Sequence, residues 1–283
     1  MGSGSPTLPR RRLGAELRRL REAMGLTHRE VAEHLDCSQG KVSQIELGRV
    51  PVRTSDVRLM LALYCSDETT ASTMLTLAKE SKPNGWWGKY TGVLAPGFDT
   101  LLSLEADARS VATFDIDLVP GPLQTTDYAR AVLAARGVGA QETEALLAVL
   151  AHRQRRLAGQ DALGIRAVVD EAALRRVVGG ADVMRAQLRH LVAASYRSSI
   201  TVQVLPFSVG AHPLLGEGVV LFEFADPADP SAAFVAGTSG YRAVDKAEDV
   251  ARRVEALDML RSIALAPKES AQCIAEIADS FSG

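Results

Sequence analysis

The sequence predicts a mainly α-helical N-terminal domain of five helices, followed by a larger α/β (α+β) C-terminal domain. The chain has 283 residues, enough for two domains of roughly 100 to 200 residues each. In the first 82 residues apolar side chains recur at helical spacing, whereas strand-like runs alternate with helical patterns further on. We expect a disordered tail at residues 1–9, a first domain at 10–82, a linker or domain entry at 83–98 and the second domain at 99–283.

The first two helices are marked by an apolar stripe and by capping signals. Leu13, Leu17, Leu20 and Met24 are spaced as one face of a helix, and Gly25 is typical of a helix C-terminus. Thr27-His28-Arg29-Glu30 has the form of a capping box, in which the threonine and glutamate side chains satisfy backbone amides. A second helix should therefore begin at about His28, and the small Ala32 allows the next helix to cross it closely.

A third helix should run from Gln39 to Leu47, with Ser38 as its N-cap and Gly48 at its end. Its apolar side chains, Val42 and Ile45, are three residues apart and predict one inward face. The polar positions between them are then free to point outward. Thr54 should cap a fourth helix with Val57, Leu61 and Tyr64 inward, and a fifth should run from about Asp67 to Lys82.

The charge is distributed unevenly along the chain. A net charge of -2 alone argues against a nucleic-acid binder. However, residues 1–82 contain 13 Lys+Arg and 10 Asp+Glu, and residues 83–283 contain 19 and 24. Two interpretations of the basic N-terminal part stay open, a solvated helix face or a phosphate-binding surface. Residues 10–21 contain six arginines and only one acidic residue, Glu16. These arginines are Arg10, Arg11, Arg12, Arg18, Arg19 and Arg21.

The segment from about Leu13 to Leu77 resembles the Xre family of lambda-repressor-like helix-turn-helix domains. The resemblance depends on Gly25-Leu26-Thr27, on Ser38-Gln39 and on the run from Ser43 to Arg49. His28 stands where the family commonly has Gln, and Asp36 where it commonly has Gly. Aspartate tolerates a left-handed backbone, so we expect the turn at Asp36 to be kept.

The resemblance implies a DNA-binding regulator whose third helix lies in the major groove. It assigns base reading to Gln39, Gly40, Lys41 and Gln44, with Lys41 reaching either a guanine edge or a phosphate. It assigns contacts with DNA phosphates to Thr27, His28, Ser43, Arg49 and Arg53, and a structural ion pair to Arg21 and Glu46. Since the excess positive charge is small, we expect a homodimer on a double-stranded DNA operator. The alternative is a helix-turn-helix that contacts only proteins.

The C-terminal region shows a mixed pattern of helices and strands. Val119-Pro120-Gly121-Pro122 predicts a turn, and Asp245 with Glu248 a capping box for a helix with Val250, Val254, Leu257 and Leu260 inward. Helices are predicted at 99–113, 126–135, 142–157, 171–178, 183–195 and 269–281, and strands at 165–169, 200–205, 219–224 and 232–235.

This region resembles an actinobacterial domain found behind Xre-type domains in antitoxin-like regulators of the Scr type. The matching residues include Val119 to Thr125, Arg153-Gln154, Asp170 to Leu174 and Val204 to Phe207. The resemblance implies a small partner protein encoded nearby, and it leaves open a small-molecule effector. The alternative function is therefore an antitoxin-like interaction module in which DNA binding is secondary.

No pattern in the sequence indicates an enzyme. His152, His190 and His212 are scattered without a catalytic or metal-binding motif, so we expect no catalytic residue, no metal and no cofactor. The cysteines, Cys37, Cys65 and Cys273, lack the spacing of a zinc site and are typical of reduced thiols in the cytoplasm. No apolar run is long enough to cross a membrane.

Overall fold

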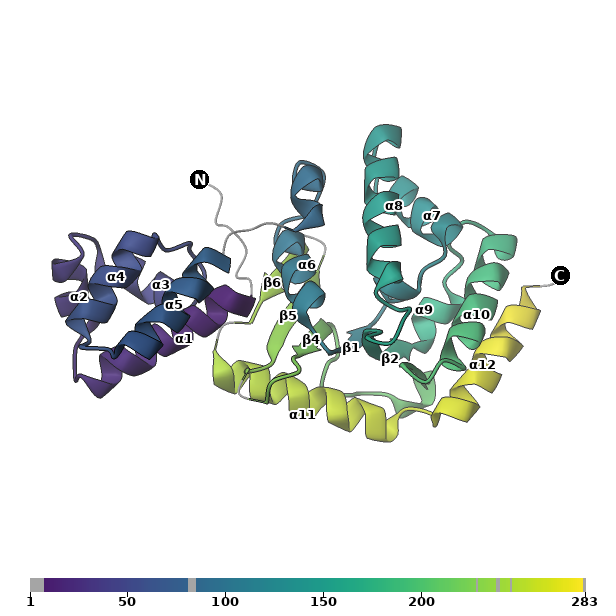
Figure 1. The fold of residues 1–283 in the computed structure, drawn as a ribbon. Coiled ribbons are helices and arrows are strands. Elements are labelled where there is room, and N and C mark those ends of the chain that lie inside the picture. The colour runs from purple at the N-terminus through teal and green to yellow at the C-terminus, as the bar shows by residue number, and fades with distance from the viewer. Residues whose placement is uncertain (1–7, 81–84, 228, 238–239, 245, 282–283) are drawn as a thin grey trace. The chain divides into compact units, whose positions relative to one another are not determined.

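The computed structural model describes residues 8–80, 85–227, 229–237, 240–244 and 246–281. The chain divides into two compact units (Figure 1). The first consists of the residues up to Gly88 together with Gly97–Asp107, and the second of Lys89–Pro96 together with the residues from Ala108 onward. Each unit has a hydrophobic cluster of its own.

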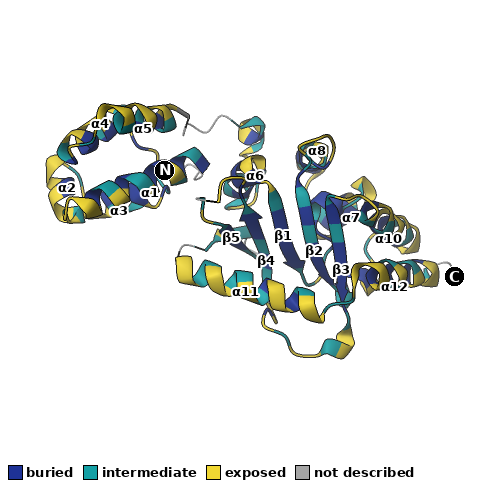
Figure 2. Cartoon of the chain, turned by 60° about the horizontal axis from the view of Figure 1, so that its bottom comes forward, coloured by how far each residue is buried: buried dark blue, intermediate teal, exposed yellow. Residues whose placement is uncertain are grey.

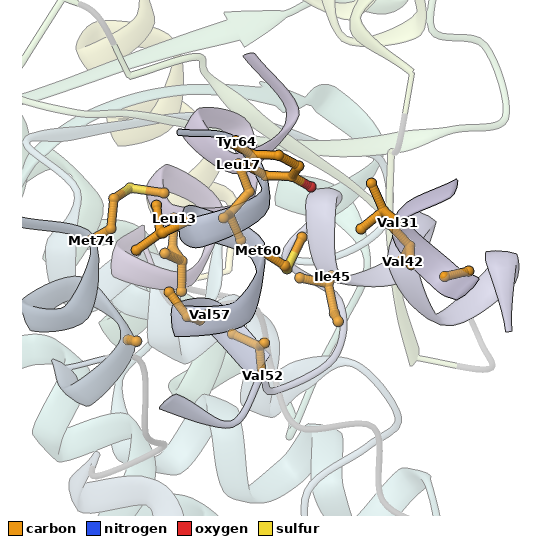
Figure 3. Packing of buried hydrophobic residues seen from close by; sticks show 13 residues of the cluster. Leu13, Leu17, Val31, Val42, Ile45, Val52, Val57, Met60, Tyr64 and Met74 are labelled. Carbon is orange, nitrogen blue, oxygen red and sulfur yellow. The ribbon is translucent and has the colours of Figure 1, made fainter. Parts of the chain in front are cut away.

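The first unit contains the five predicted helices. They are α1 (Leu8–Ala23), α2 (His28–His34), α3 (Gln39–Glu46), α4 (Thr54–Leu63) and α5 (Glu68–Glu80), and α6 (Phe98–Asp107) is grouped with them. Figure 3 shows how side chains from α1 to α5 meet in one core, with Leu17, Val31, Val42, Val57 and Met60 fully buried. The inward faces predicted for α3 and α4 are thus confirmed.

Local capping explains where these helices begin. Thr27 and Glu30 form the predicted capping box at α2, and the Ser38 hydroxyl accepts a hydrogen bond from the Lys41 amide at 3.2 Å. Asp36 has a φ of 49°, so the turn before α3 adopts the left-handed backbone expected of it.

Three details of the helix boundaries were predicted wrongly. Leu8 and Pro9, expected in the disordered tail, are the first two residues of α1, and Leu8 is buried; residues 1–7 of the expected tail lie outside the described residues. Met24 lies beyond the end of α1 and is 47% exposed, because the chain already turns at Gly25, whose φ is +67°. Thr54 is the first residue of α4 instead of its cap, and Arg53 occupies the cap position without a side-chain hydrogen bond.

Gly14 lets α1 approach α3 closely. A Cβ at this position would lie 2.5 Å from the Glu46 carbonyl oxygen and 2.6 Å from that of Ile45. We expect Gly14→Ala to lower the free energy of unfolding of this unit by about 1 to 3 kcal/mol through overpacking, measured by hydrogen exchange of α1 and α3 amides.

The matched control is Gly40→Ala on α3, because a Cβ there meets only the Ser38 Oγ, at 3.9 Å. This change should stabilise the helix by about 0.5 to 1 kcal/mol. Equal effects of the two substitutions on stability would show that the close approach of α1 to α3 does not limit the size of the side chain at position 14.

The second unit is built on a six-stranded mixed sheet with the order β3-β2-β1-β4-β5-β6. β1, β2 and β3 are parallel, while β4, β5 and β6 are joined antiparallel to their neighbours. In register, Phe114 of β1 lies between Val168 of β2 and Val219 of β4. The strands are β1 (Ser110–Asp115), β2 (Gly164–Asp170), β3 (Ile200–Leu205), β4 (Gly218–Glu223), β5 (Ala232–Gly237) and β6 (Gly240–Ala243).

Helices cover this sheet. α11 (Ala247–Ile263) runs along β1, β3, β4 and β5 (Figure 2). Its Leu257 and Leu260 are buried in the cluster that includes Phe114. α10 (Ala181–Ser195) and α12 (Pro267–Ser280) pack against each other and against β3. The remaining elements are η1 (Trp86–Tyr90), η2 (Gly121–Leu123), α7 (Thr126–Ala135), α8 (Ala140–Arg155), α9 (Glu171–Arg175) and η3 (Phe207–Val209).

The predicted helix at 99–113 is wrong in its second half, where the chain forms β1. Val111 to Phe114 are all buried and pair with strands on both sides. This short run, apolar except for Thr113, has no alternation of apolar and polar residues, so its periodicity does not separate a strand from a helix. The predicted helix at 171–178 ends early, because Arg176 is extended and Gly179 and Gly180 have positive φ.

Two further observations concern the end of the chain. The edge strand β6 was not predicted, since four residues that include Arg242 carry little strand pattern. Asp245 lies outside the described residues, and the N-cap of α11 is Lys246. In the part of the chain that the structure describes, no helix combines the length and apolarity needed to span a bilayer.

Candidate nucleic-acid interface

The α3 helix has one buried side and one polar side. Val42 and Ile45 are 0% and 2% exposed and fix the helix on the core. Gln39, Gly40 and Lys41 are exposed, and Ser43 and Gln44 are half-buried. The residues predicted to read bases therefore lie on the side of α3 that is not packed against the core.

Lys41 has a partner on the next helix. Its Nζ lies 3.2 Å from Asp56 Oδ2 of α4, and the lysine side chain is 44% exposed. The ion pair is worth little at such exposure, so it does not prevent Lys41 from turning to a stronger anion. In the free protein the pair nevertheless holds the ammonium group beside the first turn of α4.

Arg21 and Glu46 join α1 to α3. Arg21 Nε donates to Glu46 Oε1 at 2.7 Å and Nη2 to Oε2 at 3.0 Å, with side-chain exposures of only 9% and 2%. The hydrogen bond to Glu46 raises the pKa of Arg21 above its usual value. A third donor, Nη1, reaches the Leu26 carbonyl at 2.8 Å. The arginine therefore ties the carboxylate of α3 to the turn before α2.

His28 joins the same cluster. Its Nε2 lies 2.9 Å from Glu46 Oε2, and the imidazole is 40% exposed. An ionised carboxylate only accepts hydrogen bonds, so Nε2 carries the proton and Nδ1 is the remaining ring nitrogen. Sequence reasoning predicted a phosphate contact for His28 but missed this link, because the two residues are 18 positions apart and no local pattern connects them.

The other predicted phosphate contacts come from three places. Thr27 is committed to capping, since its hydroxyl donates to Glu30 Oε2 at 2.7 Å. Arg49 follows α3 and is half-buried, whereas Arg53, at the start of α4, is exposed. Sequence reasoning did not single out Arg29, whose side chain is 73% exposed on α2 beside His28 and pairs with Glu33.

Comparison with known proteins gives two matches that together cover most of the chain. Residues 12–73 match the family described as Helix-turn-helix domain, the type of domain found in DNA-binding regulators. Residues 98–276 match the family described as Domain of unknown function (DUF5753). No curated protein and no solved structure matches the chain. Since the second match covers well over half of the 283 residues, the chain belongs to the DUF5753 family and carries a helix-turn-helix domain in front of its family domain.

Proposed function

We propose that this protein is a sequence-specific transcriptional regulator of the Xre type that reads an operator with α3 in the major groove. The observation that carries the proposal is the outward polar side of α3, which is formed by Gln39, Gly40, Lys41 and Gln44. The opposite side of the helix is buried in the core through Val42 and Ile45. Glutamine amides pair a donor with an acceptor and match the edge of adenine. The buried Arg21–Glu46 pair keeps α3 at a fixed angle to α1.

The contacts with phosphates position this helix. Arg49 and Arg53 follow α3 in the chain and supply positive charge at its C-terminal side. His28 approaches a phosphate with Nδ1, because Glu46 occupies Nε2. A phosphate oxygen only accepts hydrogen bonds from such a ring, so this contact requires a donor at Nδ1.

The protein acts as a cytoplasmic homodimer in this proposal, and the C-terminal domain dimerises and senses a ligand or partner without catalysing a reaction. Residues 1–82 have an excess of only three positive charges, 13 against 10, which gives weak non-specific binding. Two half-sites about 34 Å apart, one for each protomer, supply the affinity that one domain lacks.

Operator binding by point variants tests this function. Genomic fragments that the protein retains from native-host DNA define the operator, and single base-pair changes then define specificity. We expect Gln39→Ala or Gln44→Ala to reduce discrimination at one base pair by about 1 to 3 kcal/mol. Arg49→Ala should weaken binding to all sequences and reduce the salt slope by about one.

Thr73→Ala on α5 is the matched control, because that exposed residue belongs to none of the predicted contacts. It should bind like the parent. If the two glutamine variants also discriminate like the parent, α3 is not the reading helix.

The second candidate function is an antitoxin-like module that binds a small protein encoded nearby. Large apolar side chains on the second unit favour it, since Val177, Phe207 and Leu215 are 61%, 58% and 70% exposed. Stoichiometric co-purification with the product of an adjacent gene is the expected result. Failure to recover such a protein from the native host would count against this candidate.

A further inference from the structure

The second unit contains a pocket that the proposed DNA-binding function does not use. It has a volume of about 330 Å³ and lies where η2, the end of α8, α10 and the start of β3 meet. Ligand pockets in proteins have volumes of about 300 to 1,000 Å³, so this one suits a small organic molecule. Its inner wall is apolar and buried, formed by Pro122, Leu123, Leu157, Ala194 and Ile200.

One wall of the pocket is held by two glutamine side chains. Gln187 of α10 is 0% exposed, donates to the Leu123 carbonyl at 2.8 Å and accepts from the Thr125 amide at 2.6 Å. Gln154 of α8 donates to the Gln124 carbonyl at 2.7 Å. The segment with η2 is therefore fixed to both helices, which keeps the pocket formed without a ligand.

The polar rim of the pocket favours an anion. Arg197 lines it and donates from Nη2 to the Leu157 carbonyl, while its Nε and Nη1 have no partner among the described residues. His190 also lines it, and burial together with the nearby Arg197 lowers the pKa of its imidazole. The third polar lining residue is Gln154, and no Asp or Glu of the described chain lines the pocket.

From this arrangement we propose that the pocket binds a small carboxylate with a short apolar body. The carboxylate pairs with Arg197 at the rim, and the body lies on Leu123, Leu157 and Ile200. A guanidinium group presents paired donors that suit a carboxylate. Arg197 is the one Lys or Arg side chain that lines the described pocket, which suits the single charge of a monocarboxylate. Binding at this site requires no DNA, so it stands apart from the reading role of α3.

Calorimetric titration of the full chain with hexanoate and with benzoate tests the proposal. We expect saturable binding of at least one of them at one molecule per chain. The neutral hexanamide should bind at least about tenfold more weakly than hexanoate. Arg197→Gln removes the charge and should weaken carboxylate binding about tenfold or more. Ala193→Leu adds bulk from an exposed lining position on α10 and should abolish binding.

Arg189→Gln is the matched control. Arg189 is 65% exposed on α10, the helix that precedes Arg197, and it does not line the pocket. Loss of its charge should therefore leave binding unchanged. The far-ultraviolet spectrum and melting curve of each variant establish that it is folded. The proposal is overturned if neither carboxylate binds the parent at about 10 mM, a concentration at which fragment-sized ligands bind. It is also overturned if Arg189→Gln weakens binding as much as Arg197→Gln does.

Discussion

Replacement of Glu46 by alanine is expected to lower the free energy of unfolding of the helix-turn-helix unit by about 3 to 5 kcal/mol. Arg21 is 9% exposed as a side chain and directs two nitrogens at the Glu46 carboxylate, so the variant removes the buried counter-charge and leaves only the exposed Glu22, whose Oε1 lies 3.5 Å from Nη2. His28 loses its hydrogen bond at the same time. Hydrogen exchange of the α1 and α3 amides in the full chain measures the loss separately from the second unit.

A double replacement shows that the cost comes from the stranded charge. Arg21→Met with Glu46→Leu removes both charged groups and keeps most of the side-chain volume. Such exchanges of a buried ion pair for apolar residues are often neutral or stabilising. We therefore expect the double variant to be several kcal/mol more stable than Glu46→Ala. If the two have the same stability, the contribution of Glu46 is packing and not charge pairing.

The N-terminal fold could be predicted from sequence because its signals are local. The capping box from Thr27 to Glu30, the Ser38 cap and the left-handed position at Asp36 each act within four residues. The contact of His28 with Glu46 could not be predicted in this way, since it depends on how α2 packs on α3. The same holds for Gly14, whose importance follows only from the crossing of α1 and α3.

The second unit was predicted less completely because its sheet is held by distant pairings. β1 pairs with β2 and with β4, whose residues are about 50 and 110 positions further along the chain. The composition of the buried run Val111 to Phe114 is equally compatible with a buried helix, and only these distant pairings make it a strand. The pocket beside Arg197 also combines residues from 122 to 200, so it is absent from every local pattern.

A pH-dependent stability is expected from Asp115, at the end of β1. Burial raises the pKa of this carboxyl from 3.8 to about 6, and the hydrogen bond from Thr113 and the charge of Arg153 offset only part of the rise. Between about pH 4 and pH 6 the unfolded chain loses this proton while the folded chain retains it. Folding therefore binds protons in that interval, and the contribution of Asp115 to the free energy of unfolding falls as the pH rises.

Asp115→Asn should remove this dependence, because the amide stays neutral and still offers an oxygen to Thr113. A pKa rise of this size corresponds to about 3 kcal/mol, so the variant should be more stable than the parent by up to that amount at pH 8. At pH 4 the two should be alike, since the parent carboxyl is protonated there in the folded state. Denaturant unfolding of both proteins from pH 4 to pH 8 measures the difference, with Asp127→Asn at an exposed position of α7 as the control for net charge. A difference that does not change with pH would mean that Asp115 is ionised in the folded protein throughout this range, and that Arg153 compensates fully for its burial.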